Sequence, residues 1–295
     1  MERPLVVGVD GSDSALRALD WAVDEAALHG LGLRVVHAST WERYEGPAPA
    51  RDQEDPGERG LAEGIVGAAV ERARCRNPAL RVEAEVLADE AVSALLREGN
   101  LASLLVLGSH GHRELTGLLL GSVGPAVAAR ARCPVVVVRG DAAGLAGAHR
   151  CVLLAVGDPG KSAEAVRFAF REAAARGCLL KAVRAWRGPA HERTGPSAGV
   201  ADSYHERRAT ELIDRALGEA AAAHPAVRIR RTAVEGPTHK VLVHRAAAAD
   251  LLVIGGGGHH GHFGLPLGRV AHTALCHAAC PVAVVPQRDQ GAPAA

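Results

Sequence analysis

The chain has 295 residues, 48% of them hydrophobic, which exceeds the about 100 to 200 residues of one domain and allows sizeable cores. Its 34 Lys and Arg residues nearly balance its 33 Asp and Glu residues, so the net charge gives no support to nucleic acid or a membrane surface as a partner. No apolar run reaches the about 18 residues that span a bilayer, and the first residues enter a strand pattern without a signal-like segment. We therefore expect a cytoplasmic protein of two domains.

Short apolar runs rich in β-branched residues alternate with helical patterns along the first half of the chain. Such alternation predicts parallel strands joined by crossover helices, which is an α/β fold. Two long stretches rich in Pro, Gly and charge, 41–60 and 187–206, are expected to be surface loops and candidate lids. The expected strands are PLVVGV (4–9), LRVVHA (33–38), RVEAEVL (81–87), SLLVLG (103–108) and PVVVV (134–138).

The second half repeats the first at an offset of 147 residues. SLLVLGSHG (103–111) lies over DLLVIGGGG (250–258), and RCPVVVV (132–138) lies over ACPVAVV (279–285). The first strands also correspond, with one extra residue expected in the turn of the second copy. We predict two tandem domains, 1–141 and 150–295, each built on an open, doubly wound parallel sheet. The stretch between them, GDAAGLAGAHR (140–150), is expected to be an exposed connector.

Three glycines recur with the same spacing in both copies. The first follows a buried strand and the third precedes a helix expected to begin near Ser122, so the loop lies where open α/β sheets bind ligands. Glycine lets backbone N–H groups approach an anion, and a helix N-terminus adds unpaired N–H groups, which together predict a phosphate site. Ser122 is expected either to cap the helix or to donate to a phosphate oxygen. For a single glycine, a tight turn is the alternative explanation. The glycines are Gly108, Gly111 and Gly121, then Gly255, Gly258 and Gly268.

The pattern G-x2-G-x9-G-[ST] after a hydrophobic strand, with Asp10 ending the first strand, resembles the universal stress protein family over nearly the whole of both copies. The resemblance implies five-stranded parallel sheets with flanking helices and a regulatory role in the stress response. It also implies ATP as ligand, with Mg²⁺ as its candidate companion, and pairing through the last strand, within the chain and in a homodimer. The implied cofactor-binding residues are Asp10 and Ala38 at the ribose and adenine, and Gly108, Gly111, Gly121, Ser122 and Val123 at the phosphates, with Gly255, Gly258 and Gly268 in the second copy.

The second copy departs from the pattern at two positions. Gly157 stands under Asp10, with Asp158 one residue later, and Arg269 stands under Ser122. An arginine there either grips a phosphate bidentately or fills the anion site itself. We therefore expect ATP mainly in the first domain. A slow ATPase or phosphotransferase using the same pocket, and a nucleotide-free scaffold, are the alternatives; no catalytic residue is assigned.

Three other sequence features are weaker indications of function than the glycine pattern. AVGDPGKS (155–162) fits a relaxed P-loop, but Pro159 removes one N–H group and Asp250 precedes its strand, where a magnesium-binding Asp would follow it. Histidines near the glycine loops need no metal to explain them, so no metal site is predicted. The six cysteines are expected to be reduced, with Cys133 and Cys280 as small buried residues. The histidines are His110, His112, His259, His260 and His262.

Overall fold

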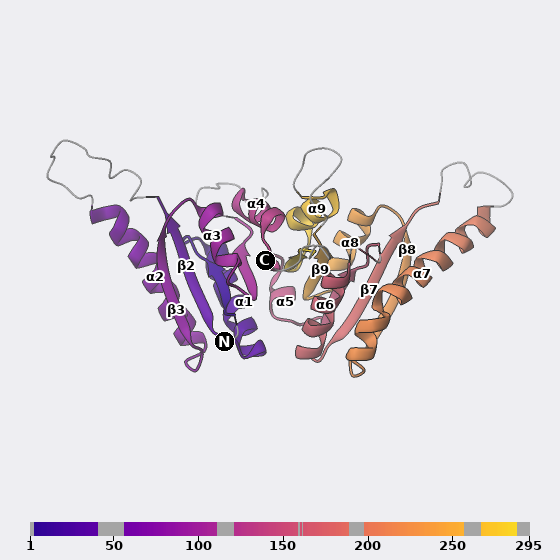
Figure 1. The fold of residues 1–295 in the computed structure, drawn as a ribbon, viewed down its shortest axis with the longest axis horizontal. Coiled ribbons are helices and arrows are strands. Elements are labelled where there is room, and N and C mark those ends of the chain that lie inside the picture. The colour runs from indigo at the N-terminus through magenta and orange to yellow at the C-terminus, as the bar shows by residue number, and fades with distance from the viewer. Residues whose placement is uncertain are drawn as a thin grey trace, which may run out of the picture. The chain divides into compact units, whose positions relative to one another are not determined.

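Each half of the chain forms its own α/β unit in the computed structural model, unit 1 over Met1–Arg139 and unit 2 over Gly140–Ala295 (Figure 1). The structure describes residues 3–40, 56–110, 121–158, 160, 162–188, 198–256 and 267–287. Unit 1 contains β1 (Leu5–Gly8), α1 (Asp13–His29), β2 (Leu33–Ser39), α2 (Pro56–Arg76), β3 (Val82–Ala88), α3 (Ala91–Gly99), β4 (Leu104–Gly108), α4 (Val123–Arg130) and β5 (Val135–Val138). Unit 2 contains α5 (Ala142–Leu145), β6 (Cys151–Ala155), α6 (Ala163–Ala175), β7 (Leu179–Trp186), α7 (Ala198–Ala223), β8 (Ile229–Glu235), α8 (Thr238–Ala246), β9 (Leu251–Gly255), α9 (Arg269–His277) and β10 (Val282–Val285).

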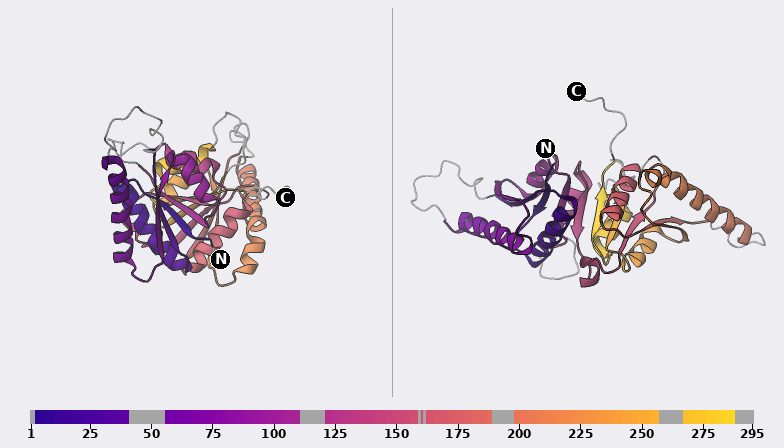
Figure 2. Two further views of the ribbon diagram at one scale, coloured as in Figure 1. Left: turned by 60° about the vertical axis from the view of Figure 1, so that its left-hand side comes forward. Right: turned by 90° about the horizontal axis from the view of Figure 1, so that it is seen from below.

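Within the described residues, each unit has five parallel strands, in the order β3-β2-β1-β4-β5 in unit 1 and β8-β7-β6-β9-β10 in unit 2. Helices α1 and α2 cover one face of the first sheet and α3 and α4 the other, and α6, α7, α8 and α9 are divided in the same way (Figures 1 and 2). The predicted α/β class with two doubly wound five-stranded sheets is confirmed. Strand order reverses between β1 and β4, and ligands of open α/β sheets bind beyond the carboxyl ends of the strands at such a point. We call this the carboxyl edge.

The sequence explains these elements locally. Strands β1, β4 and β5 are buried along almost their whole length, as parallel strands covered by helices require, and they are accordingly continuous apolar runs. Helix α1 begins after Ser12, whose side chain accepts from the Ala15 N–H, and it ends at Gly30 in the left-handed conformation with φ of 66°. Between these caps, small and apolar residues recur at helical spacing and face the sheet. They are Ala15, Ala18, Leu19, Ala22, Val23 and Ala26.

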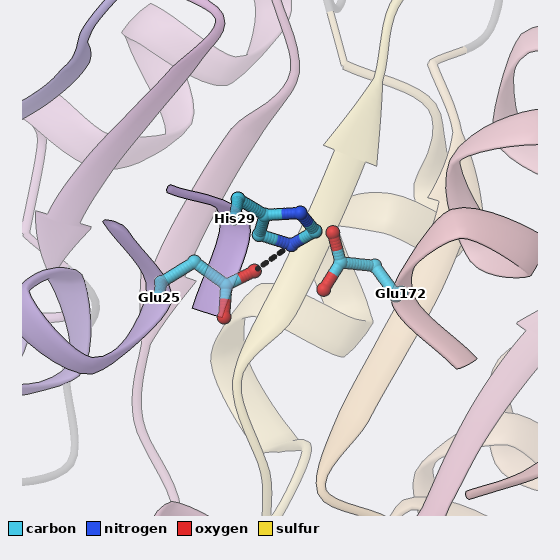
Figure 3. A group of neighbouring side chains, drawn as sticks. All are labelled: Glu25, His29 and Glu172. Atoms are coloured by element: carbon cyan, nitrogen blue, oxygen red, sulfur yellow. Dashed lines mark ion pairs between the residues drawn. The ribbon is translucent and has the colours of Figure 1, made fainter. Parts of the chain in front are cut away.

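A buried carboxylate lies on the first helix of each unit. Glu25 on α1 is 2% exposed, and its Oε1 lies 3.3 Å from Nε2 of His29, one turn later (Figure 3). In unit 2 the equivalent Glu172 on α6 is also buried, and Arg176 pairs with it at 3.2 Å. A buried carboxylate is costly unless it is paired and hydrogen-bonded, so a basic side chain one turn later suits both helices.

The repeat holds at a constant offset of 147 residues in the strand registers. Leu5 pairs with Leu33 and Val152 with Leu180, so the first strands of both units are aligned without a gap. The expected extra residue in the second copy is therefore wrong. Instead, α6 is shorter than α1 at its N-terminus. It begins at Ala163, whereas the counterpart of Asp13, the first residue of α1, is Gly160.

The two stretches expected to be loops are partly helical. Helix α2 begins at Pro56 and α7 at Ala198, inside 41–60 and 187–206. Proline is well suited to a first helical position, and the later part of α7, ERRATELIDRALGEAAAA (206–223), is rich in Ala, Glu and Arg, which favour helix. Residues 41–55 and 189–197 lie outside the described residues. In the part of the chain that the structure describes, no helix is long and apolar enough to cross a membrane.

Candidate functional site

A cavity of about 620 Å³ lies at the carboxyl edge of unit 1. The ends of β1, β2 and β4, the first turns of α3 and α4, and one face of α2 form its walls. Six residues predicted from the sequence line it together, although they come from four separate segments. They are Asp10, Ala38, Gly108, Gly121, Ser122 and Val123.

The other predicted glycines have different outcomes. Gly111 and Gly258 lie outside the described residues. Gly255 ends β9 and Gly268 precedes α9, so both stand at the carboxyl edge of unit 2. The part that any of these residues takes in binding stays a prediction.

The Asp10 carboxylate is held by the turn that follows β1. Its Oδ1 accepts from the Ser12 N–H at 3.0 Å and from the Ser12 hydroxyl at 2.6 Å. The same hydroxyl accepts from the Ala15 N–H at 3.2 Å, which caps α1. The turn therefore orients the carboxylate on the cavity wall before any ligand binds.

Gly108 is required by the packing of β4 against α1. A Cβ atom at this position would lie 2.7 Å from the Ser14 hydroxyl and 2.8 Å from the Ser14 carbonyl carbon. Real Cβ atoms do not approach backbone so closely, and the helix backbone has little room to move. Glycine is thus needed at 108 independently of any ligand.

Hydrogen bonds fix both ends of the unit 1 glycine loop. The Gly121 N–H donates to the Ser109 carbonyl at 3.0 Å, and the His110 N–H donates to the Ser14 hydroxyl at 3.2 Å. Ser122 stands at the N-cap of α4 in a helical conformation, and its side chain makes no capping hydrogen bond. Of the two expected roles of Ser122, capping is therefore wrong, and donation to a phosphate oxygen stays a prediction.

Sequence reasoning missed two acidic residues of the cavity wall, Asp89 and Glu90. Glu90 caps α3 by accepting from the Ser93 N–H at 3.2 Å, and Asp89 pairs with Arg97 at 2.8 Å. Slight burial raises the pKa of Glu90, but hydrogen bonds from the Ser93 and Val92 N–H groups outweigh it and lower the pKa below its ordinary value. An acidic pair between a strand and a helical pattern is a helix-start signal and would have indicated this position.

Apolar side chains of α2 and a histidine of β2 complete the wall. Leu61 and Ile65 lie one turn apart on the face of α2 that lines the cavity, and Leu61 is 66% exposed, which is unusual for a large apolar side chain. His37 Nδ1 lies 2.7 Å from the Val9 carbonyl oxygen, so the ring is held against the end of β1. The cavity thus joins an apolar wall to a carboxylate and a loop bounded by glycine.

The carboxyl edge of unit 2 is built differently. Arg184 occupies the position of His37, and its guanidinium donates to the carbonyl oxygen of Gly157 at 2.6 Å and to Asp158 Oδ1 at 3.0 Å. Gly157 supplies no carboxylate where Asp10 stands in unit 1, and the shifted Asp158 is paired with Arg184. Neither residue reproduces the environment of Asp10.

The remaining motifs have structural explanations. Asp250 is buried and accepts from the backbone N–H groups of His149 at 2.9 Å and Cys151 at 2.8 Å, so it ties the start of β9 to the start of β6 and is not placed as a P-loop partner would be. None of the six cysteines forms a disulfide, and Cys133 and Cys280 are buried. Burial raises the pKa of the Cys133 thiol to about 11, which keeps it protonated near neutral pH.

Of the histidines near the glycine loops, the structure describes His110. Its Nδ1 lies 2.8 Å from the Ser109 hydroxyl, and this contact accounts for one ring nitrogen without a metal ion. The other four lie outside the described residues, namely His112, His259, His260 and His262.

Comparison with known proteins gives a consistent family. Residues 1–139 and 149–286 each match the model of the universal stress protein family. The chain is 32% identical over 294 residues to universal stress protein Rv2005c of Mycobacterium tuberculosis strain H37Rv, which covers 96% of this chain and 97% of that protein. Universal stress protein Rv2623 of the same strain is 31% identical over 290 residues, 95% of each protein. A solved universal stress protein from Archaeoglobus fulgidus shares the fold, with a TM-score of 0.71, 16% identity and 98% of each chain covered.

Proposed function

The chain belongs to the universal stress protein family, and from this premise we propose that it is an ATP-binding regulatory protein of the stress response whose nucleotide is held in unit 1. One observation carries the proposal. The unit 1 cavity places an apolar wall, a pre-oriented carboxylate and the glycine-bounded start of α4 around a single space. Its volume of about 620 Å³ falls within the range of about 300 to 1,000 Å³ that small-molecule sites occupy.

Each part of the cavity suits one part of ATP. The apolar side chains of Leu61 and Ile65, opposite the end of β2, suit the faces of an adenine ring. The Asp10 carboxylate accepts hydrogen bonds from ribose hydroxyls. The Ser122 hydroxyl and the N–H groups at the start of α4 suit phosphate oxygens, which the helix dipole also attracts. Mg²⁺ would arrive with the triphosphate, and we assign it no protein ligand.

The polar groups of the described wall favour retention of ATP over its hydrolysis. Asp10 holds Ser12, Glu90 holds the first turn of α3, and His37 Nδ1 contacts the Val9 carbonyl oxygen. A general base must be within reach of the attacking water, and groups committed to backbone contacts are poorly suited to that role. A slow ATPase or phosphotransferase is the alternative that turnover measurements test.

We propose that unit 2 does not hold ATP. Its edge lacks the Asp10 carboxylate, and Arg184 contacts the Gly157 carbonyl at the corresponding position. The domain limits 1–141 and 150–295, pairing through the last strands within the chain and in a homodimer, and cytoplasmic localisation stay predictions, as does the absence of a nucleic acid or membrane partner.

Calorimetric titration of the purified, nucleotide-free chain with ATP tests the proposal. We expect about one ATP per chain, and mass spectrometry of the denatured protein should identify nucleotide that co-purified with it. Incubation with Mg²⁺ should leave that ATP intact over many hours, whereas conversion to ADP would support the enzyme alternative. A chain that neither retains nor binds ATP would be a nucleotide-free scaffold, and a stoichiometry near two would contradict the assignment to unit 1.

A further inference from the structure

The carboxyl edges of the two units differ in charge at six matching positions, although unit 2 also carries the acidic Asp158 and Glu235 at its edge. Three carboxylates of unit 1 have uncharged counterparts in unit 2, while three neutral residues of unit 1 have cationic counterparts. Gly157, Gly236 and Pro237 replace Asp10, Asp89 and Glu90, and Arg187, Lys240 and Arg269 replace Thr40, Ser93 and Ser122. Strand registers at a constant offset set these equivalences, so the difference in charge does not depend on a gapped alignment.

The three cations come together because parallel strands end at the same edge of a sheet. Arg187 directly follows β7, Lys240 lies in the first turn of α8 after β8, and Arg269 begins α9 after β9. Helices α8 and α9 pack against each other on one face of the sheet. All three side chains are exposed, and within the described residues they form no ion pair.

The pKa of His239, which is next to Lys240 on α8, is affected by the positive charges at this edge. Residual desolvation and the positive charges of Arg269, Lys240 and Arg187 lower the pKa of its imidazole. Three cations from three separate segments therefore act on one ring, which agrees with their placement by the topology. Like charges gathered in this way repel one another, and an anion bound among them would relieve that repulsion.

The part of the unit 2 edge that corresponds to the nucleoside end of the unit 1 cavity holds two large side chains. His37 and Ser39 line the unit 1 cavity, and their counterparts are Arg184 and Trp186. The guanidinium of Arg184 is fixed by the Gly157 carbonyl and the Asp158 carboxylate. The indole of Trp186 stacks on His205 of α7, with ring centroids 6.0 Å apart and planes inclined by 21°. Arg184 and Trp186 are thus held in place at positions where the unit 1 cavity is lined by the smaller side chains of His37 and Ser39.

We propose that the carboxyl edge of unit 2 binds a multiply charged phosphate anion without a nucleoside, of the tripolyphosphate type, through Arg187, Lys240 and Arg269. Guanidinium and ammonium groups are the side chains that bind phosphate, and two arginines allow bidentate contacts. Arg184 and Trp186 take up the room that a nucleoside would need. The proposal concerns a different unit from the ATP site, and only its exclusion of a nucleoside rests on the proposed function of unit 1.

Calorimetry with tripolyphosphate as the probe tests this in the full chain, alone and in the presence of saturating ATP. We expect one tripolyphosphate per chain in both conditions. The variant Lys240→Glu/Arg269→Glu should weaken this binding by about a hundredfold, since each lost charged contact costs about tenfold or more. Its ATP binding should be unchanged. Arg228→Glu is the matched control, because Arg228 is exposed but precedes β8 at the opposite edge of the sheet.

Three outcomes would overturn the proposal. They are the absence of tripolyphosphate binding, equal weakening by the control and the double variant, and complete displacement of tripolyphosphate by ATP, which would put the anion in the unit 1 cavity. The charge-preserving variant Lys240→Arg/Arg269→Lys should retain tripolyphosphate binding within a few fold. It shows that both positions tolerate substitution, so that weaker binding by Lys240→Glu/Arg269→Glu can be assigned to the change of charge and not to misfolding. Failure of ATP to bind would contradict the unit 1 proposal alone.

Discussion

Arg184 Nη2 donates to Asp158 Oδ1 at 3.0 Å, so the carboxylate that follows β6 in unit 2 is already paired within the protein. In unit 1 the shorter His37 stands at the same position and contacts the Val9 carbonyl, while Asp10 lines the cavity. A guanidinium has more donors and a longer reach than an imidazole, so Arg184 reaches the carboxylate that follows the first strand of unit 2. Together with Gly157 in place of Asp10, this leaves the described residues at the strand end without an unpaired carboxylate for a ligand.

Asp10→Ala should weaken ATP binding by about 1 to 3 kcal/mol, because the carboxylate no longer accepts hydrogen bonds from the ribose. Asp158→Ala is the matched control in unit 2 and should change the affinity little. Calorimetry gives both values, and thermal melting shows whether loss of the Ser12 contact affects the fold. Equal losses at the two positions would mean that unit 2 also binds nucleotide.

Gly121→Val should weaken ATP binding sharply without unfolding the protein. A β-branched side chain crowds the phosphate position and restricts the turn before α4. Affinity is measured by calorimetry and the fold by circular dichroism. A folded variant with unchanged affinity would remove the glycine loop from the site.

Gly108→Ala should instead lower stability. The new Cβ would meet the Ser14 backbone at 2.8 Å, and overpacking of this kind costs about 1 to 3 kcal/mol. Chemical denaturation measures the loss. Gly124→Ala is a suitable comparison, since its Cβ would make an ordinary contact with Val137 at 3.6 Å. If both variants were equally stable, the close approach of β4 to α1 would not be the reason for Gly108.

Glu90 should make the stability of unit 1 depend on acid pH. Its pKa is lowered in the folded state by the α3 N–H groups, so its stabilising contribution is present above the unfolded pKa and is lost as pH falls through the folded value. The stability difference between the wild type and Glu90→Gln should therefore be larger at pH 7 than at pH 3. A difference independent of pH would assign the contribution to packing and not to charge.

Converting unit 2 to an ATP site should need four changes. Arg269→Ser alone leaves Arg184 across the Gly157 carbonyl, leaves Trp186 at the position of Ser39 and leaves no carboxylate at the ribose position. We expect the ATP stoichiometry to stay near one in that variant and to rise toward two in Gly157→Asp/Arg184→His/Trp186→Ser/Arg269→Ser, measured by calorimetry. A rise with Arg269→Ser alone would show that Arg269 by itself excludes phosphate.

The sequence by itself determined the duplicated α/β fold, because buried parallel strands must be apolar runs and the repeat preserved them at one offset. It also indicated the first candidate residues of the site, since glycine spacing and an acidic strand end are local features. Only the tertiary structure decided that the close approach of Ser14 makes a glycine necessary at position 108. It alone showed that Asp89 and Glu90 line the cavity, and that Arg184 pairs with Asp158. Each of these depends on the distance between groups of different helices and strands. Packing sets that distance, and it cannot be read from the spacing of residues along the chain.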